Sequence, residues 1–394
     1  MDIKIYSEKQ KSNRFGVVNA VSCGSLGIYV KSRATKNEQT DTEQLDKSHK
    51  LIKRFSLLWK SKRILKGVAS KSVLGCMRTT MQEFVELHKS DGHANFNGVV
   101  TCKSKHVCPV ESPSIASVEA KYIGEAIRKC CAEGNEPYML TLTARHDKSM
   151  TLAYCMKSMH DASQVFWRSG SVRRFFDTFF FGRITALEET WSLATGWHVH
   201  YHVLLFGERG LLTNPFCDVG SFFSRQWLHA LERVGLTGVD GVASNFQGAS
   251  AVKNYLTKMP LEITMQNFKE GRAGGLNPFG ILQASNECDI YAEKWREYYL
   301  ATKGKRVIVW SDGLKARYGI ADKTDDEIAE EANNDILDAL ERVVIYVDAY
   351  DWRHKVCSDS YNLAYLKTCG IVDVPPFLDA LGVQYATGFE VEAT

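Results

Sequence analysis

The stretch Thr195–Phe206, TGWHVHYHVLLF, alternates polar and apolar side chains with a period of two. Because successive side chains of a β-strand point to opposite faces, this pattern predicts a strand with His198, His200 and His202 on one face. The intervening valines, tyrosine and leucine would pack into a core. A single histidine on a strand is usually a core or surface residue, whereas three in strict alternation favour a metal site. The chain therefore needs a sheet with one functional face.

A carboxylate could complete such a site from the strand before it. The segment RITALEETW carries Glu188 and Glu189 and is separated from the histidines by the turn-like SLATG. Adjacent strand residues point to opposite faces, so only one glutamate can face the histidines, and the sequence does not decide which. Two imidazoles and one carboxylate with open positions suit Mn²⁺ or Mg²⁺ that also binds a phosphate oxygen. A closed zinc site would use cysteines, which this stretch lacks.

The surrounding segments predict the fold class. Tyr138–Arg145 has the composition of a strand, and helical patterns occupy 150–169, 222–234 and 249–259, the last stopped by Pro260. The order of strand, helix, strand, strand, helix predicts an α+β fold with helices packed on an antiparallel sheet.

Composition narrows the class of protein. The chain has no run of eighteen or more apolar residues, and its amino-terminal MDIKIYSEKQKSNRF is too charged for a secretory signal. We therefore expect a cytoplasmic protein with no membrane partner. Eleven cysteines in such a chain are expected to be thiols or metal ligands rather than a disulfide framework.

Charge is unevenly distributed despite a net charge of only +3. Lys47–Ser72 carries nine Lys or Arg and no acid, whereas Asp322–Asp351 carries eleven acids against two bases. This asymmetry predicts a surface for a polyanion, although two solvated amphipathic helices would give the same pattern. Arg173, Arg174 and the aromatic Phe175–Phe181 could contact single-stranded nucleic acid, but burial of these aromatics explains the pattern as well.

Several motifs occur together in a known order. GWHVHYHVLLF resembles the histidine motif of the HUH endonucleases, and specifically of bacterial plasmid rolling-circle replication initiator (Rep) proteins. YMLTLTARH, RITALEET, AVKNYLTKM, GGLNPFGILQ and YYLATKGKRVIVWSDGLKARYG resemble further parts of these proteins. The resemblance covers roughly residues 95–330. It implies a ferredoxin-like or RRM-like antiparallel sheet with packed helices, flanked by an N-terminal basic extension and a C-terminal helical or mixed extension.

The resemblance assigns roles to individual residues. His200 and His202 match the two metal-binding histidines, and Glu188 matches the carboxylate of the preceding strand; His198 and Glu189 are secondary candidates. Tyr255 and Lys258 match the Y-x-x-K nucleophile motif. The helical spacing of this segment is equally typical of a core residue at Tyr255, and the histidines favour the catalytic role.

The family chemistry implies partners. Tyrosine attack would nick one strand of the plasmid double-strand origin and leave a 5′-phosphotyrosyl enzyme and a 3′-hydroxyl primer. A host DNA polymerase would extend the primer, and single-strand-binding protein would cover the displaced single-stranded DNA. The sequence has no G-x-x-x-x-G-K-[ST] loop, so a host helicase would unwind the template. An HUH relaxase or transposase, or a non-catalytic DNA-binding regulator, are the alternatives.

The chain departs from the family at two places. Ala251 stands where some relatives carry a glutamate used in termination, so Glu262 or Tyr291 are alternatives for that step. The cysteine segment has Cys108 followed by Pro, Val and Glu where relatives often have C-P-x-C. Cys102 and Cys108 remain secondary zinc candidates, with Cys76 and His106 as further ligands, in a set that is incomplete by the usual spacing.

These patterns divide the chain into four segments. Residues 1–95 are expected to form an arm, up to residue 46, and a basic helical region. Residues 96–134 form a cysteine-containing loop and helix, 135–300 the HUH nickase and strand-transfer domain, and 301–394 an acidic C-terminal region.

Overall fold

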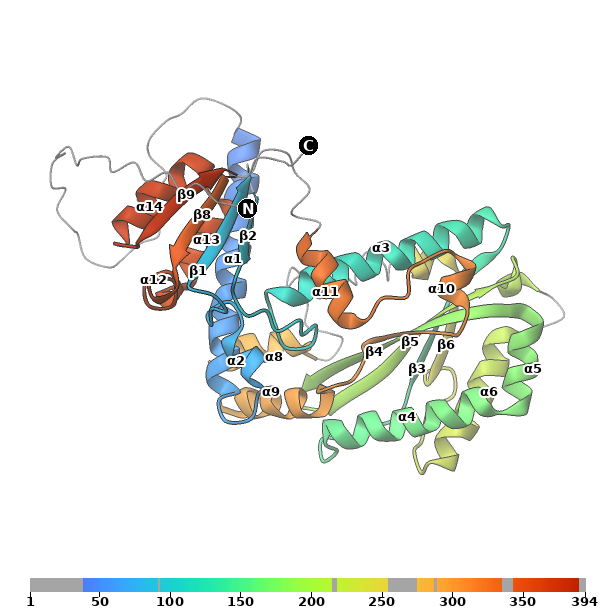
Figure 1. Ribbon diagram of the computed structural model, residues 1–394. Coiled ribbons are helices and arrows are strands. Elements are labelled where there is room, and N and C mark those ends of the chain that lie inside the picture. Colours follow the sequence, from blue (N-terminus) through green and yellow to red (C-terminus); the bar gives the residue numbers. More distant parts are fainter. Residues whose placement is uncertain are drawn as a thin grey trace. The chain divides into compact units, whose positions relative to one another are not determined.

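The computed structural model describes residues 38–90, 93–214, 218–253, 275–286, 289–334 and 343–389. These residues form an α+β structure with antiparallel sheets, which confirms the predicted fold class (Figure 1). The chain divides into two compact units. Unit 1 contains residues 1–55, 77–100 and 336–394, and unit 2 contains residues 56–76 and 101–335. The predicted segments 1–95 and 301–394 are therefore each divided between the two units.

Unit 2 is built on a five-stranded antiparallel sheet in the order β6-β3-β5-β4-β7. The strands are β3 (Glu136–Thr143), β4 (Phe180–Ser192), β5 (Gly196–Gly207), β6 (Ser244–Gln247) and β7 (Ile308–Trp310). The predicted histidine strand is therefore β5, at the centre of the sheet and paired on both sides.

Helices cover both faces of this sheet. Figure 1 shows α3 (Glu111–Ala132) along one face, and α4 (Leu152–Arg168) with α6 (Val219–Arg233) along the other. The face of Leu140 and Val203 packs against α4, α6 and α9 (Asp289–Thr302), whereas the face of Met139 and Leu204 packs against α3 and α10 (Leu314–Arg317). The strands β3, β4 and β5 therefore contribute alternate side chains to two separate cores.

The remaining helices of unit 2 extend these two layers. They are α2 (Lys71–Gly75), α5 (Gly170–Phe179), α8 (Pro278–Ala284) and α11 (Asp325–Asn334). Thr151 and Asp218 cap the first turns of α4 and α6 by accepting backbone N–H groups, which satisfies donors that have no partner within the helix. The helices α4 and α6 match the helical patterns predicted at 150–169 and 222–234, whereas the pattern at 249–259 lies partly outside the described residues.

Unit 1 has its own four-stranded antiparallel sheet, in the order β2-β1-β8-β9. The strands are β1 (Phe84–Ser90), β2 (His93–Asn97), β8 (Val343–Asp348) and β9 (Tyr385–Phe389), accompanied by α12 (Ala349–His354), α13 (Ser360–Thr368) and α14 (Val374–Ala380). The fully buried Lys89 of β1 donates a hydrogen bond to the carbonyl of Leu366 in α13. This contact links the sheet of unit 1 to that helix.

One expectation from the sequence needs correction here. The helix α1 (Glu38–Ile64) begins before residue 47, so residues 38–46 are helical rather than part of a loose arm. Within the C-terminal region 301–394, β8 is an apolar, partly buried strand. No helix of the described residues is long and apolar enough to cross a membrane.

Candidate metal and nucleic-acid site

The hairpin of β4 and β5 places Glu188 beside the histidines. In the register of this pair, Glu188 lies opposite His200 and Ala186 lies opposite His202. Along β5, positions 198, 200 and 202 are half-buried, whereas 199, 201 and 203 are buried. The pairing register therefore selects Glu188 as the glutamate that shares the histidine face.

Three donor atoms converge at this point of the sheet. The Nε2 atoms of His200 and His202 lie 3.1 Å apart, and each lies 3.2 Å from the Oε2 atom of Glu188. The three atoms form a nearly equilateral triangle. The structure thus brings together the two histidines and the carboxylate named from the sequence.

The size of this triangle fits three ligands of one divalent cation. Ligand bonds of ~2.1 Å at right angles separate adjacent donor atoms by about 3.0 Å. Tetrahedral bonds of that length separate them by about 3.4 Å, and the observed edges of 3.1 and 3.2 Å lie between these two values. A cation on one face of the triangle would keep its other positions for water and a phosphate oxygen. Glu188, His200 and His202 are therefore candidate ligands for a divalent cation such as the predicted Mn²⁺ or Mg²⁺.

Neighbouring groups fix the orientation of the His202 ring and the protonation state of Glu188. The Nδ1 atom of His202 lies 3.1 Å from the hydroxyl oxygen of Thr141 on β3, which fixes the ring and directs Nε2 toward Glu188. His200 Nδ1 is buried and has no hydrogen-bond partner among the described residues. Burial acts to raise the pKa of Glu188, but His202 and His200 outweigh it and hold that pKa well below its usual range. The carboxylate is therefore ionised at neutral pH.

The secondary candidates lie outside the cluster. Glu189 is buried on the opposite face, and burial together with the Glu188 charge raises its pKa to about 8. His198 Nδ1 lies 3.3 Å from His146 Nδ1, and burial with the neighbouring His200 and His146 lowers the pKa of His198 to about 4. Sequence analysis missed His146 and Thr141, since neither belongs to the histidine alternation.

The predicted nucleophile lies outside the described residues, as do Lys258 and Glu262. Residues 249–253, the last ones described before this part of the chain, are helical. Val252 of this segment is buried in the core on the Met139 and Leu204 face, which is also the face of the histidines. The chain segment that leads to Tyr255 is thus packed on the metal-candidate side of the sheet.

The basic region of α1 is partly used for structure. Lys60 is buried and donates to the carbonyl of Gln283, and Lys62 donates to the carbonyl of Cys76. Polyanion binding can therefore involve only part of the nine basic groups counted in the sequence. In α5, Arg173 and Arg174 are exposed.

The aromatic stretch beside them is mainly packed. Phe175 stacks on Phe222 with ring centroids 3.9 Å apart, and Phe180 is buried. Arg183 lies over the ring of Trp167. The structure thus favours a core role for most of these aromatic side chains.

A cavity of about 450 Å³ provides a second basic surface in unit 2. Its lining includes the basic residues Lys103, Lys105, Lys303, Lys305 and Arg306. Two of these are engaged by acids, because Lys103 pairs with Glu330 at 2.6 Å and Lys105 pairs with Glu119. The positively charged side chains of Lys303, Lys305 and Arg306 make this cavity a candidate contact for phosphate groups.

Comparison with known proteins gives one relevant similarity. The chain is 23% identical over 294 aligned residues to a protein of Streptomyces lividans named Protein rep. The aligned part covers 57% of this chain and 64% of that protein, so the chain spans less than two thirds of the relative's length. No family model and no solved structure matches the chain.

Proposed function

We propose that this protein is a metal-dependent, site-specific DNA nickase and strand transferase that initiates rolling-circle replication of a plasmid. The observation that carries the proposal is the convergence of His200, His202 and Glu188 on paired central strands of an antiparallel sheet. The similarity to the Protein rep of Streptomyces lividans supports the replication role. The HUH motif resemblance supplies the type of chemistry.

The ligand cluster prepares the site for a scissile phosphodiester. A Mn²⁺ or Mg²⁺ held by Glu188, His200 and His202 would polarise the phosphodiester and stabilise charge on its oxygens. The depressed pKa of Glu188 keeps this carboxylate in its ligating form at neutral pH. Thr141 restrains the His202 ring, so less conformational freedom is lost when the site is filled.

Tyr255 performs the covalent step in this proposal. Its phenol has an ordinary pKa of ~10 and must lose its proton before or during attack on the phosphorus. A bond forms between the tyrosine oxygen and phosphorus, the bond from phosphorus to the 3′-oxygen breaks, and the leaving oxygen takes up a proton as the 3′-hydroxyl. Lys258 adds positive charge near the phosphate. The phosphotyrosine bond conserves the energy needed for later resealing.

The proposal also defines partners in the cytoplasm. The substrate is the double-strand origin of the plasmid, and the 3′-hydroxyl is a primer for a host DNA polymerase. Because the sequence has no phosphate-loop motif of an ATP motor, unwinding would depend on a host helicase, with single-strand-binding protein on the displaced strand.

A nicking assay tests the proposal. The protein is incubated with Mn²⁺ and a supercoiled plasmid that carries its own origin, and nicked DNA linked covalently to protein is measured. We expect linked, nicked DNA from the wild type and none from Tyr255→Phe. The matched control is Tyr154→Phe, which removes the hydroxyl of an exposed tyrosine on α4 and should leave nicking unchanged.

The possible outcomes separate the alternatives. Specific origin binding without nicking by the wild type would overturn the enzymatic proposal and favour a DNA-binding regulator. Unchanged nicking by Tyr255→Phe would exclude this tyrosine as the nucleophile while leaving the metal cluster in place. Nicking of a transfer origin in preference to the replication origin would favour a relaxase.

A further inference from the structure

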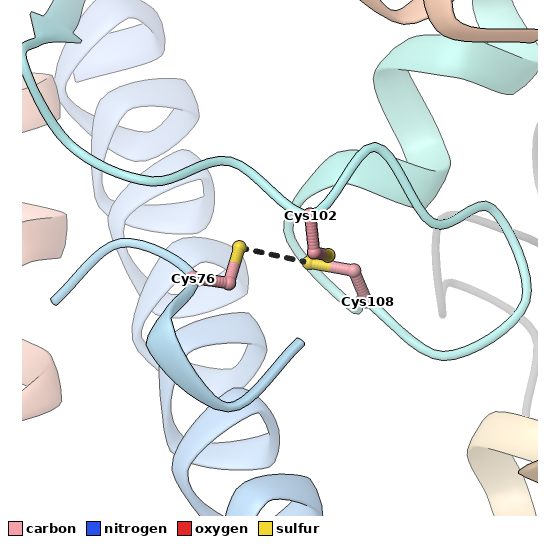
Figure 2. Close-up of side chains that lie close together, drawn as sticks. All are labelled: Cys76, Cys102 and Cys108. Carbon is pink, nitrogen blue, oxygen red and sulfur yellow. Dashed lines mark hydrogen bonds between the residues drawn. The ribbon is translucent and has the colours of Figure 1, made fainter. Parts of the chain in front are cut away.

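Three cysteines of unit 2 come together although residues 77–101 separate Cys76 from the other two in the sequence. Cys76 follows directly after α2, and Cys102 and Cys108 belong to the loop that leads into α3. Figure 2 shows their side chains pointing toward one another. We propose that Cys76, Cys102 and Cys108 bind a structural zinc ion, separate from the histidine cluster.

The sulfur geometry fits zinc. The three sulfur atoms all lie within 4.8 Å of one another, and the Sγ atoms of Cys76 and Cys108 are 3.8 Å apart. Zinc–sulfur bonds of ~2.3 Å in a tetrahedron place two sulfur atoms about 3.8 Å apart. A disulfide would need ~2.05 Å between the same atoms. The observed spacing excludes a disulfide and matches that of two ligands on one tetrahedral ion.

Backbone N–H groups lie beside the buried sulfur atoms of this cluster. Cys76 and Cys108 are almost completely buried. The backbone N–H of Glu111 donates to Cys108 Sγ at 3.4 Å, and the backbone amides of Ser104 and Cys102 hydrogen bond with the sulfurs of Cys102 and Cys76. Such N–H groups offset the negative charge that three thiolates bring to one zinc ion.

The fourth position is not taken by His106. Its Nδ1 atom lies 3.2 Å from the Tyr298 hydroxyl, and its Nε2 atom lies 2.8 Å from the carbonyl of Lys305. Both ring nitrogens are therefore engaged elsewhere, against the expectation from the sequence. Among the described residues, the ligand atoms that gather here are the three sulfur atoms, so a water molecule would complete the four-coordinate ion.

The position of the cluster suggests what the ion stabilises. Residues 77–100 belong to unit 1, so the chain leaves unit 2 after Cys76 and returns to it just before Cys102. A zinc ion bound by Cys76 and Cys102 would hold together the two points at which the chain leaves unit 2 and returns to it. It would also hold the loop that carries Lys103 and Lys105 to the basic cavity. We assign the ion a structural role because its ligands would come from both sides of the insertion.

Metal content tests the proposal directly. The full chain carrying His200→Ala and His202→Ala is purified without a metal-chelating tag, so that any metal counted lies outside the histidine cluster. We expect about one zinc ion per chain, measured by inductively coupled plasma mass spectrometry. Adding Cys102→Ser should reduce zinc to near zero. Adding Cys155→Ser, a buried cysteine in the same unit but outside the cluster, should leave it unchanged.

A second measurement covers the case in which Cys102→Ser does not fold. X-ray absorption at the zinc edge of the otherwise unaltered double-histidine variant should show three sulfur neighbours and one oxygen or nitrogen neighbour. Zinc-free protein, or a zinc ion with one sulfur neighbour or none, would overturn the proposal. So would a Cys76–Cys108 disulfide in protein purified without oxygen, because oxidised sulfurs cannot be thiolate ligands.

Discussion

At the scale of single residues, Thr141 is the clearest addition that the structure makes to the candidate metal site of Glu188, His200 and His202. Its hydroxyl holds His202 in the rotamer that faces Glu188. We predict that Thr141→Val weakens Mn²⁺ binding by about 10-fold, as loss of such an outer contact generally does. Isothermal titration calorimetry measures this. Removal of a ligand, as in His202→Ala, should abolish measurable binding.

A matched control lies two residues along the same strand. The Thr143 hydroxyl is buried without a hydrogen-bond partner among the described residues, although Thr143 is paired with His200 in the sheet. Thr143→Val should therefore leave Mn²⁺ affinity unchanged. Equal losses in the two variants would show that the effect comes from general perturbation of β3 rather than from orientation of His202.

A second residue prediction concerns pH and unit 1. Asp351 is buried and accepts hydrogen bonds from the backbone N–H of Gln384 at 2.6 Å and from Lys355 at 2.7 Å. Burial acts to raise the pKa of Asp351, but Lys355 and the Gln384 amide outweigh it and lower that pKa below 3.8. The folded state is thus stabilised above pH 3.8, and this contribution disappears as the pH falls through the folded-state pKa.

Asp351→Asn should accordingly reduce the free energy of unfolding by ~1 kcal/mol at pH 7, a modest value because part of the interaction is screened by water. The difference from wild type should shrink as the pH falls below 3.8 and through the folded-state pKa. Urea unfolding at a series of pH values measures it. A difference that stays constant throughout this acid range would mean that packing, rather than the charge of Asp351, accounts for the loss.

At the scale of elements, the β4–β5 hairpin depends on Gly196. This residue has φ +79°, and an added Cβ would lie 2.6 Å from the Cα atom of Lys148. Gly196→Ala therefore combines a left-handed backbone with a clash against main chain. We predict a loss of ~2–4 kcal/mol in the free energy of unfolding, measured by urea titration.

Gly235 provides the control for backbone strain alone. It has φ +76°, but nothing lies within 4 Å of an added Cβ. Gly235→Ala should cost only ~1 kcal/mol. If the two alanine variants were equally stable, close packing of the hairpin against Lys148 would not be what requires glycine at position 196.

Elements were largely predictable because each has a local periodic signal. The alternation in β5 and the helical patterns of α4 and α6 match the observed elements, since they depend on which side chains a strand or helix buries. Periodicity alone does not decide between Glu188 and Glu189, because that choice depends on the pairing of β4 with β5; only the family resemblance pointed to Glu188. Thr141 joins the site from β3, a strand that lies 61 residues earlier than His202, so no local pattern reveals it.

At the scale of the whole molecule, the sequence did not reveal two interleaved units. The sheet of unit 1 pairs β1 with β8, and Lys89 bonds to Leu366 across 277 residues. Such long-range pairing leaves no trace in local periodicity. Cys76 joins the other two cysteines for the same reason, because the β1–β2 insertion separates it from them in the sequence.

This organisation predicts how the chain can be shortened. The insertion begins and ends close together, since Met77 N–H donates to the Val100 carbonyl at 2.7 Å. Residues 56–76 joined by a short flexible linker to 101–335 should therefore keep unit 2 intact, with Mn²⁺ affinity like that of the full chain. The continuous chain 56–335 keeps β1 and β2 but lacks β8, so it exposes an unpaired strand edge and the apolar side of β1.

We expect the continuous chain 56–335 to aggregate and the chain with the insertion removed to stay monomeric, as measured by size-exclusion chromatography with light scattering. The physical reason is that β1 buries Val85 and Leu87 completely, and β8 is its only other neighbour in the described sheet besides β2. If both shortened chains aggregated, unit 2 would need unit 1 to fold. If both stayed monomeric, the β1–β2 hairpin would not depend on β8, and the two units would be less distinct than their separate sheets imply.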